Sequence, residues 1–407
     1  MVARVRSASL EPLSVGSSFV PDRVPPATSP GRVTMVALTA CVVLEDGTVF
    51  PGERIGAPTD AAGEVVFTTS MTGYQEVMSD PSYRGQIVVM AYPLVGNYGF
   101  SPQAWEARRP HVAGFVVREA CPIPSNYQSD EPLTDFLRRY GLVGLSGVDT
   151  RRLVRHLRVH GLQRGVIGDG AVSSLIERAR AVPFLDEQDL VGQVACTAPH
   201  MLGGEGPRVV IIDCGVKAGI IDALRRRGCE IILVPPRFTA SEITRLAPAG
   251  IVLSNGPGDP AVLGETVRLV KDLLGTCPIM GICLGHQILA LALGGRTYKM
   301  KFGHRGSNHP VHEPSTGQVV ITTQNHGYAV DPALPDSVLV THVSLNDGTV
   351  EGLRHRTLPA FSVQFHPEGR PGPADAEYLY DRFVSTLAPC GTPSSSGAPV
   401  STQAGVG

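Results

Sequence analysis

Short apolar runs alternate with helix-like stretches in the second half of the chain, and this alternation constrains the fold more than any other feature. From residue 208 the order is strand, helix, strand, as in "RVVIIDCG", "KAGIIDALRRRG" and "EIILVPP", and "GIVLSNGPGDP" and "PIMGICLG" continue it. Strands that are apolar throughout are typical of a parallel sheet covered on both faces. We therefore predict an α/β domain over residues 207–388, with an open, mostly parallel sheet and helices on both faces.

The first half of the chain has a more mixed pattern. Runs rich in β-forming residues, such as "ACVVLEDGTVF" and "GQIVVMAYP", are followed by helix-like stretches at 134–140 and 150–159. This pattern predicts a separate mixed α/β domain over residues 37–185, joined to the second domain by a glycine-rich linker at 186–206. We interpret residues 1–36 as a disordered or mis-assigned extension, with an organellar transit peptide as the alternative, and the low-complexity stretch 389–407 as a disordered tail.

Charge and cysteine usage narrow the class of protein. The net charge of −2 over 407 residues is spread along the chain, which gives no reason to expect a nucleic-acid partner. No apolar run approaches the length needed to cross a bilayer, so we expect no membrane partner. Eight cysteines without a C-x-x-C pair favour free thiols in a reducing, cytoplasmic compartment. No phosphate-binding glycine motif follows a strand, so we expect no nucleotide cofactor in this chain.

One cysteine lies at a tight corner between a predicted strand and a predicted helix. Cys283 follows the apolar run 279–282 and is flanked by Gly281 and Gly285 in "GICLGHQ". Glycines at such a join allow a sharp turn, which is the form of a nucleophile elbow. The backbone N–H groups at a helix start favour the thiolate, the form that attacks. Alternatively, Cys283 is a small apolar residue in the core.

Two other strand ends carry groups that a cysteine nucleophile needs. His366 and Glu368 follow the strand predicted at 361–365 in "FHPEG", and residues two apart in an extended segment point the same way. The carboxylate can then orient the imidazole as a base. Gly256 and Gly258 follow another strand, where backbone N–H groups can stabilise an oxyanion. Because ligands bind at the carboxyl ends of parallel strands, we expect these three segments to meet.

The remaining histidines do not favour a metal site. His304, His309 and His312 lie in "FGHRGSNHPVHE", which we interpret as a loop without a fixed register, so we predict no metal there. We expect His286 to pack near Cys283 without acting as its base, and we keep His326 as an alternative base.

Taken together, G-I-C-L-G-H-Q, S-N-G-P-G-D-P, Q-N-H-G and H-P-E resemble the motifs of class I glutamine amidotransferase domains. The resemblance implies that Cys283 attacks the side-chain amide of glutamine and forms a glutamyl thioester. It also implies that His366 is the base and then the acid, and that Glu368 orients it. The backbone amides of Leu284 and Gly258 would form the oxyanion hole.

The first half identifies a narrower resemblance. "GEVVFTTSMTGYQEVMSDPSYRGQIVVMAYPLVGNYG" and "GLSGVDTRRLVRHLR" are similar to the carbamoyl-phosphate synthase small-chain family. This implies glutamine contacts from Ser82, Gly256, Gly258, Leu284, Gln287, Asn325, Gly327 and Tyr328. The chain departs from the family pattern in three places: Tyr328 stands where Phe is usual, "KAGI" at 217–220 replaces a Lys-x-Asn-Ile motif, and Arg370 replaces a small residue. We expect neither of the last two departures to touch Cys283, His366 or Glu368.

The resemblance implies a glutaminase subunit that delivers ammonia to a separate large subunit. ATP and Mg²⁺ would act on that large subunit, which makes carbamoyl phosphate from bicarbonate, and this chain would need no cofactor of its own. The alternatives are a glutaminase subunit serving anthranilate or GMP synthesis, and a non-catalytic scaffold. The additional first domain argues against the first alternative, and the presence of all three catalytic residues argues against the second.

Overall fold

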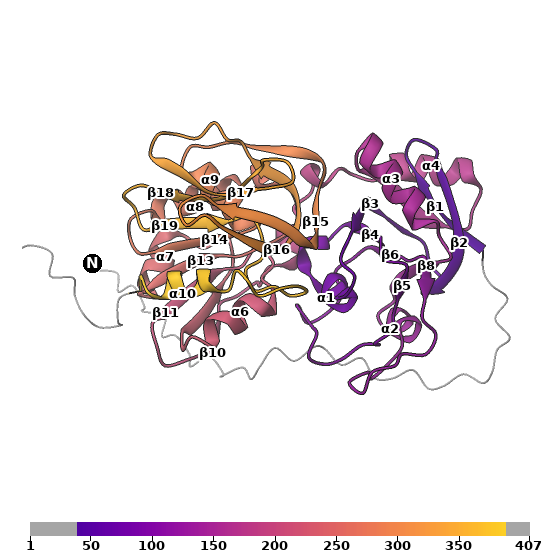
Figure 1. Cartoon of the computed structure of the whole chain (residues 1–407), viewed down its shortest axis with the longest axis horizontal. Coiled ribbons are helices and arrows are strands. Elements are labelled where there is room, and N and C mark those ends of the chain that lie inside the picture. The colour runs from indigo at the N-terminus through magenta and orange to yellow at the C-terminus, as the bar shows by residue number, and fades with distance from the viewer. Residues whose placement is uncertain (1–38, 388–407) are drawn as a thin grey trace, which may run out of the picture.

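The structure is a computed structural model that describes residues 39–387 of the chain. Two bodies lie side by side, a barrel formed by the first part of the chain and a larger layered body formed by the second (Figure 1). The predictions for residues 1–36 and 389–407 concern segments outside the described residues.

Seven strands of the first body close into a barrel in the order β1-β2-β8-β6-β4-β3-β9. Alternating apolar residues fill its interior, among them Val42, Val65, Ile87 and Ile167, all fully buried. A closed barrel leaves no strand edge unpaired. Its strands are β1 (Thr39–Leu44), β2 (Val49–Gly56), β3 (Ala61–Thr68), β4 (Gln86–Met90), β6 (Gly114–Val116), β8 (Val143–Ser146) and β9 (Gln163–Gly168).

Helices and a small ribbon surround the barrel. Helix α3 begins where the side chain of Asp149 caps the backbone N–H of Arg152, and its Leu153 and Leu157 pack against the barrel core. The pair β5 (Leu94–Val95) and β7 (Glu119–Ala120) forms a separate two-stranded sheet. The helices around the barrel are α1 (Tyr74–Ser79), α2 (Leu133–Arg139), α3 (Thr150–His160) and α4 (Val172–Arg180). Helix α5 (Val191–Val194) follows them and packs through Val191 in the core of the second body.

The second body is built on five parallel strands in the order β12-β11-β13-β14-β19. Because they are parallel, their carboxyl ends lie along one edge of the sheet, as predicted. The strands are β11 (Arg208–Ile212), β12 (Glu230–Val234), β13 (Gly250–Leu253), β14 (Ile279–Ile282) and β19 (Ala360–Val363).

Antiparallel strands extend this sheet on both sides. The segment expected to be a linker forms helix α5 and then strand β10 (His200–Gly203), which pairs with β12. On the other side lie β18 (Val350–His355), β16 (Gln318–Val330), β15 (Thr297–Glu313) and β17 (Val338–Ser344). The prediction of a loop around His304, His309 and His312 was therefore wrong, because all three lie in β15.

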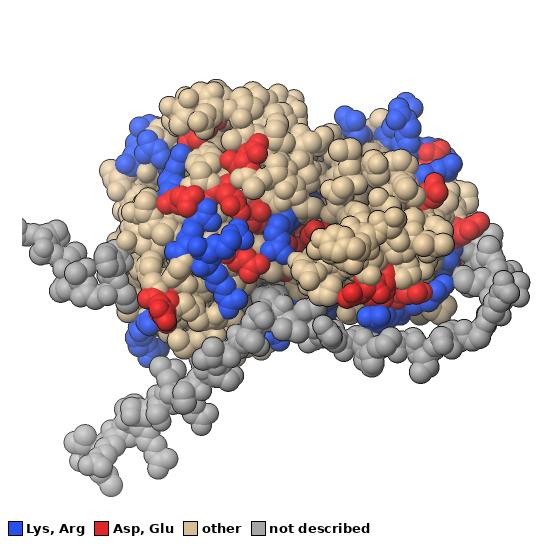
Figure 2. All heavy atoms as spheres, turned by 60° about the horizontal axis from the view of Figure 1, so that its bottom comes forward, with Lys and Arg blue, Asp and Glu red and all other residues tan. Residues whose placement is uncertain are grey.

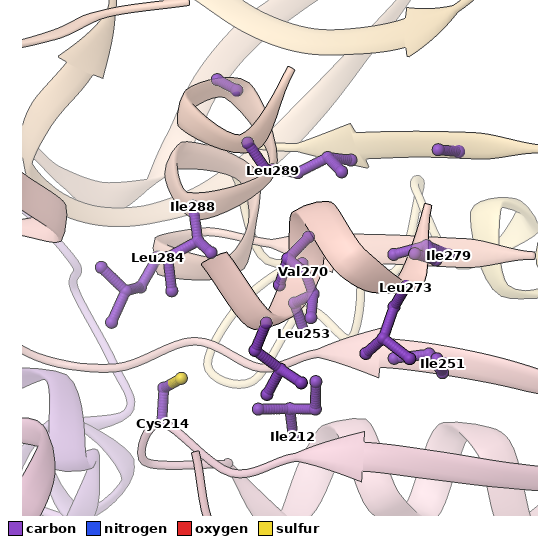
Figure 3. Close-up of a cluster of buried hydrophobic side chains, with 14 of the residues drawn as sticks. Ile212, Cys214, Ile251, Leu253, Val270, Leu273, Ile279, Leu284, Ile288 and Leu289 are labelled. Carbon is purple, nitrogen blue, oxygen red and sulfur yellow. The ribbon is translucent and has the colours of Figure 1, made fainter. Parts of the chain in front are cut away.

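Alternate residues of the parallel strands face two separate cores. Ile212, Leu253 and Ile279 pack against α7, α8 and α9 on one face (Figure 3), whereas Ile211 and Val252 pack against α6 and α10 on the other. Both faces are covered, which explains why these strands are apolar throughout and confirms the predicted α/β class. The helices are α6 (Ala218–Arg225), α7 (Ala240–Arg245), α8 (Gly264–Leu273), α9 (Leu284–Ala292) and α10 (Tyr378–Val384).

Candidate active site

Cys283 lies at the turn between β14 and α9 and has a backbone conformation that residues other than glycine rarely adopt. Its φ is 55° and its ψ −104°, and its N–H donates to the carbonyl oxygen of Val363 at 2.9 Å. A Cβ on Gly281 would lie 2.5 Å from the carbonyl oxygen of Gly285, and one on Gly285 would lie 2.2 Å from that of Leu253. The two glycines are therefore required by the turn. Such strain at a non-glycine residue is typical of functional sites.

The glycine turn after β13 lies beside the start of α9. The N–H of Gly285 donates to the carbonyl oxygen of Ser254 at 3.0 Å, which ties the two segments together. A Cβ on Gly256 would lie 2.1 Å from the carbonyl oxygen of Cys214, and Gly258 has a φ of 90°. Leu284 is the first residue of α9, where backbone N–H groups have no partner within the helix. Leu284 and Gly258 line one pocket with Cys283.

His366 and Glu368 form a buried pair. Nδ1 of His366 lies 2.7 Å from Oε1 of Glu368, and both side chains are fully enclosed. Burial disfavours the imidazolium, but the carboxylate of Glu368 outweighs burial and raises the pKa of His366 to about 10. Nε2 of His366 is buried and has no hydrogen-bond partner of normal geometry among the described residues, although the Cys283 thiol is close enough to help raise this pKa.

Lys217 is a third member of this group that sequence reasoning did not assign. Its Nζ donates to Oε1 of Glu368 at 3.0 Å and to the carbonyl oxygen of Arg370. Burial opposes ionisation of Glu368, but Lys217 and His366 together hold the pKa of Glu368 well below its usual range. A Cβ on Gly219 would lie 2.9 Å from Cγ of Glu368. The expectation that 217–220 and Arg370 lie away from the three residues was wrong, because the chain folds Lys217 and Gly219 directly against Glu368.

A single pocket brings together Cys283 and all eight residues expected to contact glutamine. Cys283 donates from Sγ to the carbonyl oxygen of Asn325 at 3.5 Å, and Gln287 donates to the carbonyl oxygen of Tyr328 at 2.9 Å. The eight lining residues are Ser82, Gly256, Gly258, Leu284, Gln287, Asn325, Gly327 and Tyr328. Seven further lining residues were not among the expected glutamine contacts, although His326 had been considered as an alternative base: Glu64, Gln86, Leu162, Leu185, Lys299, Arg305 and His326.

The barrel supplies one wall of this pocket. Asn255 donates from Nδ2 to Oγ of Ser82 at 2.9 Å, and Asn325 donates to Oδ2 of Asp80 at 3.1 Å. Asp80 also accepts from the backbone N–H of Ser82. Only the serine had been expected, from the resemblance. Asp80 lies in the same segment as Ser82, but its contact with Asn325, 245 positions away, left no local signal in the sequence.

His304 and His326 belong to a hydrogen-bonded cluster that reaches the pocket, since both face Gln324 and His326 lines the pocket. Potential ligand atoms of His304, His326 and Glu351 lie within 4.8 Å of one another. Both ring nitrogens of His304 face acceptors, Gln324 and Asp347, at 2.9 and 2.8 Å. Burial lowers the pKa of His326 well below its ordinary value, which does not suit it to act as the base. His286 lies in the core, where its Nδ1 is 2.9 Å from Oγ of Ser362.

Charged side chains of both signs lie interspersed on the face shown in Figure 2, in keeping with the near-neutral net charge. Among residues 39–387 there is no helix that combines the length and hydropathy of a membrane span.

Comparison with known proteins matches both halves of the chain to families. Residues 210–386 match the family "Glutamine amidotransferase class-I", and residues 42–167 match the "Carbamoyl-phosphate synthase small chain, CPSase domain". The carbamoyl phosphate synthase small chain of Syntrophotalea carbinolica is 49% identical over 369 residues, which cover 86% of this chain and 98% of that one.

Two further relatives give the same result. The carbamoyl phosphate synthase small chain of Symbiobacterium thermophilum is 53% identical, over 84% of this chain and 97% of its own. The pyrimidine-specific small chain of Halalkalibacterium halodurans is 49% identical, over 85% of this chain and 96% of its own. These matches span both bodies of the structure in one alignment. The chain therefore belongs to the carbamoyl phosphate synthase small chain family.

Proposed function

We propose that this chain hydrolyses L-glutamine to glutamate and ammonia and passes the ammonia to a carbamoyl phosphate synthase large subunit. The observation that carries the proposal is the buried series of ionic contacts from Lys217 to Glu368 and from Glu368 to His366, which lies close to Cys283 in the lining of the pocket. The match over residues 42–167 supports this reading over a subunit of anthranilate or GMP synthesis.

The chemistry begins with attack of the Cys283 sulfur on the side-chain carbonyl carbon of glutamine. Transfer of the Cys283 proton to His366, which the raised pKa of His366 favours, gives the imidazolium–thiolate pair that reacts. The N–H groups of Leu284 and Gly258 stabilise the negative oxygen of the tetrahedral intermediate. His366 gives its proton to the departing nitrogen, so that the carbon–nitrogen bond breaks and ammonia leaves. A glutamyl thioester remains.

Water then releases the product. The now neutral His366 removes a proton from water, and the hydroxide attacks the thioester carbonyl. The carbon–sulfur bond breaks, glutamate leaves, and the imidazolium–thiolate pair is restored. Glu368 stays ionised throughout and orients the imidazole, and Lys217 keeps Glu368 ionised.

The roles proposed for the partner and the cofactors rest on what glutamine hydrolysis does not require. Glutamine hydrolysis by this scheme needs no metal or nucleotide. We propose that ATP, Mg²⁺ and bicarbonate act on the large subunit, and that this chain binds none of them.

Cys283→Ser tests the proposal in the complex with the large subunit. We expect carbamoyl phosphate synthesis from glutamine to be lost and synthesis from added ammonia to remain, because only the first needs the sulfur. Cys277→Ser is the matched control, since this half-buried thiol lies two residues before β14 but does not line the pocket. Equal loss of both activities in Cys283→Ser, or full glutamine-dependent activity, would contradict the proposed division of labour.

A further inference from the structure

Within residues 39–387, Arg305 is a buried cation with no ionic partner. It lies in β15 and is only 4% exposed. Its Nη1 donates to the carbonyl oxygen of Phe302 at 2.7 Å, and its Nε has no hydrogen-bond partner within the described part of the chain. No carboxylate among residues 39–387 lies within ion-pair distance of it, whereas nearby Lys299 is paired with Glu64 at 3.2 Å. Because a buried charge without a partner is costly, the vacant donors of Arg305 indicate that something else fills this role.

The guanidinium group lies against the wall of the pocket that holds Cys283. A Cβ on Gly327 would lie 3.3 Å from Nη2 of Arg305, and one on Gly303 would lie 2.9 Å from Nη1. Both glycines leave room for the planar group beside their backbone. Arg305 and Gly327 line the pocket together with Cys283. The unpaired charge is therefore fixed in the space proposed for glutamine.

The other charged groups of the pocket leave one positive charge uncompensated. Glu64 is shared between Lys299 and Nε2 of Gln86, which lies 3.1 Å from its second oxygen. His326 is neutral, since burial lowers its pKa well below the ordinary value. Two cations thus face one carboxylate, so the pocket attracts an anionic group. The α-carboxylate is the only anionic group of glutamine.

We propose that Arg305 recognises the α-carboxylate of glutamine and so determines specificity for an amino acid with a free carboxylate. The inference rests on the proposed function, because it assigns a part of that same substrate. A guanidinium with vacant N–H donors can bind a carboxylate through charge-assisted, forked hydrogen bonds. Glu64, the carboxylate that lines the same pocket, favours the α-ammonium group by opposite charge.

The test compares two substrates in the complex with the large subunit: L-glutamine and L-glutaminamide, in which a neutral amide replaces the α-carboxylate. We expect the wild type to have a much higher kcat/KM for glutamine. Arg305→Gln should lower kcat/KM for glutamine by about thirtyfold or more, mainly through KM, and leave glutaminamide hydrolysis within about twofold. Arg305→Lys should keep part of the preference. Lys299→Gln, at a partly exposed cation already paired with Glu64, should change the preference much less.

Three outcomes would overturn the inference while leaving the proposed function in place. The first is that the wild type hydrolyses both substrates equally well, a measurement that needs no variant. The second is an equal loss on both substrates in Arg305→Gln. The third is a matching loss in the rate at which iodoacetamide alkylates Cys283, which would mean that Arg305 acts on the sulfur. Failure of the proposed function is distinguishable, because the wild type would then release no ammonia from glutamine. Ammonia-dependent synthesis reports that each variant folds and assembles.

Discussion

The parallel sheet and the barrel differ in where they place the residues that line the pocket. In the sheet, β13, β14 and β19 run the same way, so Gly256, Cys283 and His366 follow three carboxyl ends at one edge. In the barrel, three neighbouring pairs around β8, β6, β4 and β3 are parallel, and the pairs that complete the closed circuit are antiparallel. Its contribution to the pocket comes from Glu64 of β3, Gln86 at the start of β4, and Ser82 in the 3-10 turn that precedes β4. The open sheet thus gathers the reacting groups, and the barrel supplies a wall that holds them.

Of the variants that distinguish the roles of the two bodies, His366→Asn should have the largest effect on glutamine hydrolysis. General acid–base catalysis is typically worth about a hundredfold to ten-thousandfold, so kcat for glutamine hydrolysis should fall by this amount. Ammonia-dependent synthesis in the complex should not change. Near wild-type glutamine hydrolysis in this variant would mean that the base lies elsewhere.

The free energy of unfolding of the same variant should depend on pH differently from that of the wild type. The pKa of His366 is raised from 6.5 to about 10, so its protonation stabilises the folded chain fully below pH 6.5, and this contribution is lost as the pH rises through 10. The difference in unfolding free energy between wild type and His366→Asn should therefore shrink between these pH values. Denaturant titrations at pH 6, 8 and 10 measure it.

Glu368→Gln should have the next largest effect. The carboxylate orients the imidazole without moving a proton, so the loss in kcat should be roughly tenfold or more smaller than in His366→Asn. Removing the carboxylate should also lower the pKa of His366. The alkaline fall of kcat/KM for glutamine should then move to lower pH. An unchanged pH profile with reduced activity would indicate that Glu368 does not set the protonation of His366.

Gly256→Ala should reduce activity on the order of tenfold to a hundredfold, because its Cβ would press on the carbonyl oxygen of Cys214 and displace the turn beside Leu284. Gly52→Ala in the barrel is the matched control. There a Cβ would lie 2.6 Å from the carbonyl oxygen of Ser146, far from the pocket lining. It should lower the melting temperature and leave kcat unchanged. Equal changes in kcat would show that the two bodies are not separable in function.

Ser82→Ala tests the wall that the barrel provides. The change leaves Nδ2 of buried Asn255 without its acceptor, which should lower the free energy of unfolding by about 1–3 kcal/mol. We expect KM for glutamine to rise and kcat to change little, since the serine does not take part in the proton transfers. Chemical denaturation and steady-state kinetics measure the two effects. An unchanged unfolding free energy would mean that this bond does not hold the two bodies together.

The sequence predicts the parallel core well because each of its strands is a short local signal. The run 279–282 matches β14, and the helices expected at 134–140 and 150–159 overlap α2 and α3. The long strand β15 was missed because glycine, asparagine and proline in "FGHRGSNHP" are typical of loops. It stays a strand by shifting register against β16 between Lys299 and His304 and between Gly306 and His309.

The site was predictable where its residues follow strands and hidden where its contacts are long-range. Gly256, Cys283 and His366 each mark a strand end, so their meeting could be expected from topology. Lys217 also follows a strand, β11, but its partner Glu368 lies 151 residues away and no local pattern joins them. Arg305 gave no signal either, because only the fold shows that its side chain is buried without an ionic partner in the described part of the chain.

The smallest effect is expected for Tyr328→Phe, at a position where the resemblance implies phenylalanine. The Tyr328 hydroxyl is buried and has no hydrogen-bond partner of normal geometry among residues 39–387. Burial raises the pKa of this phenol and nearby Asp259 raises it further, so the hydroxyl stays neutral. Removing a buried polar group that lacks a partner costs no hydrogen bond and is neutral or stabilising. The contact of this residue with Gln287 runs through its backbone carbonyl, which phenylalanine keeps. We therefore expect kcat/KM for glutamine within about twofold of wild type and an equal or higher melting temperature. A larger rise in KM would show that the hydroxyl binds the substrate, which would move part of glutamine recognition from the backbone to this side chain.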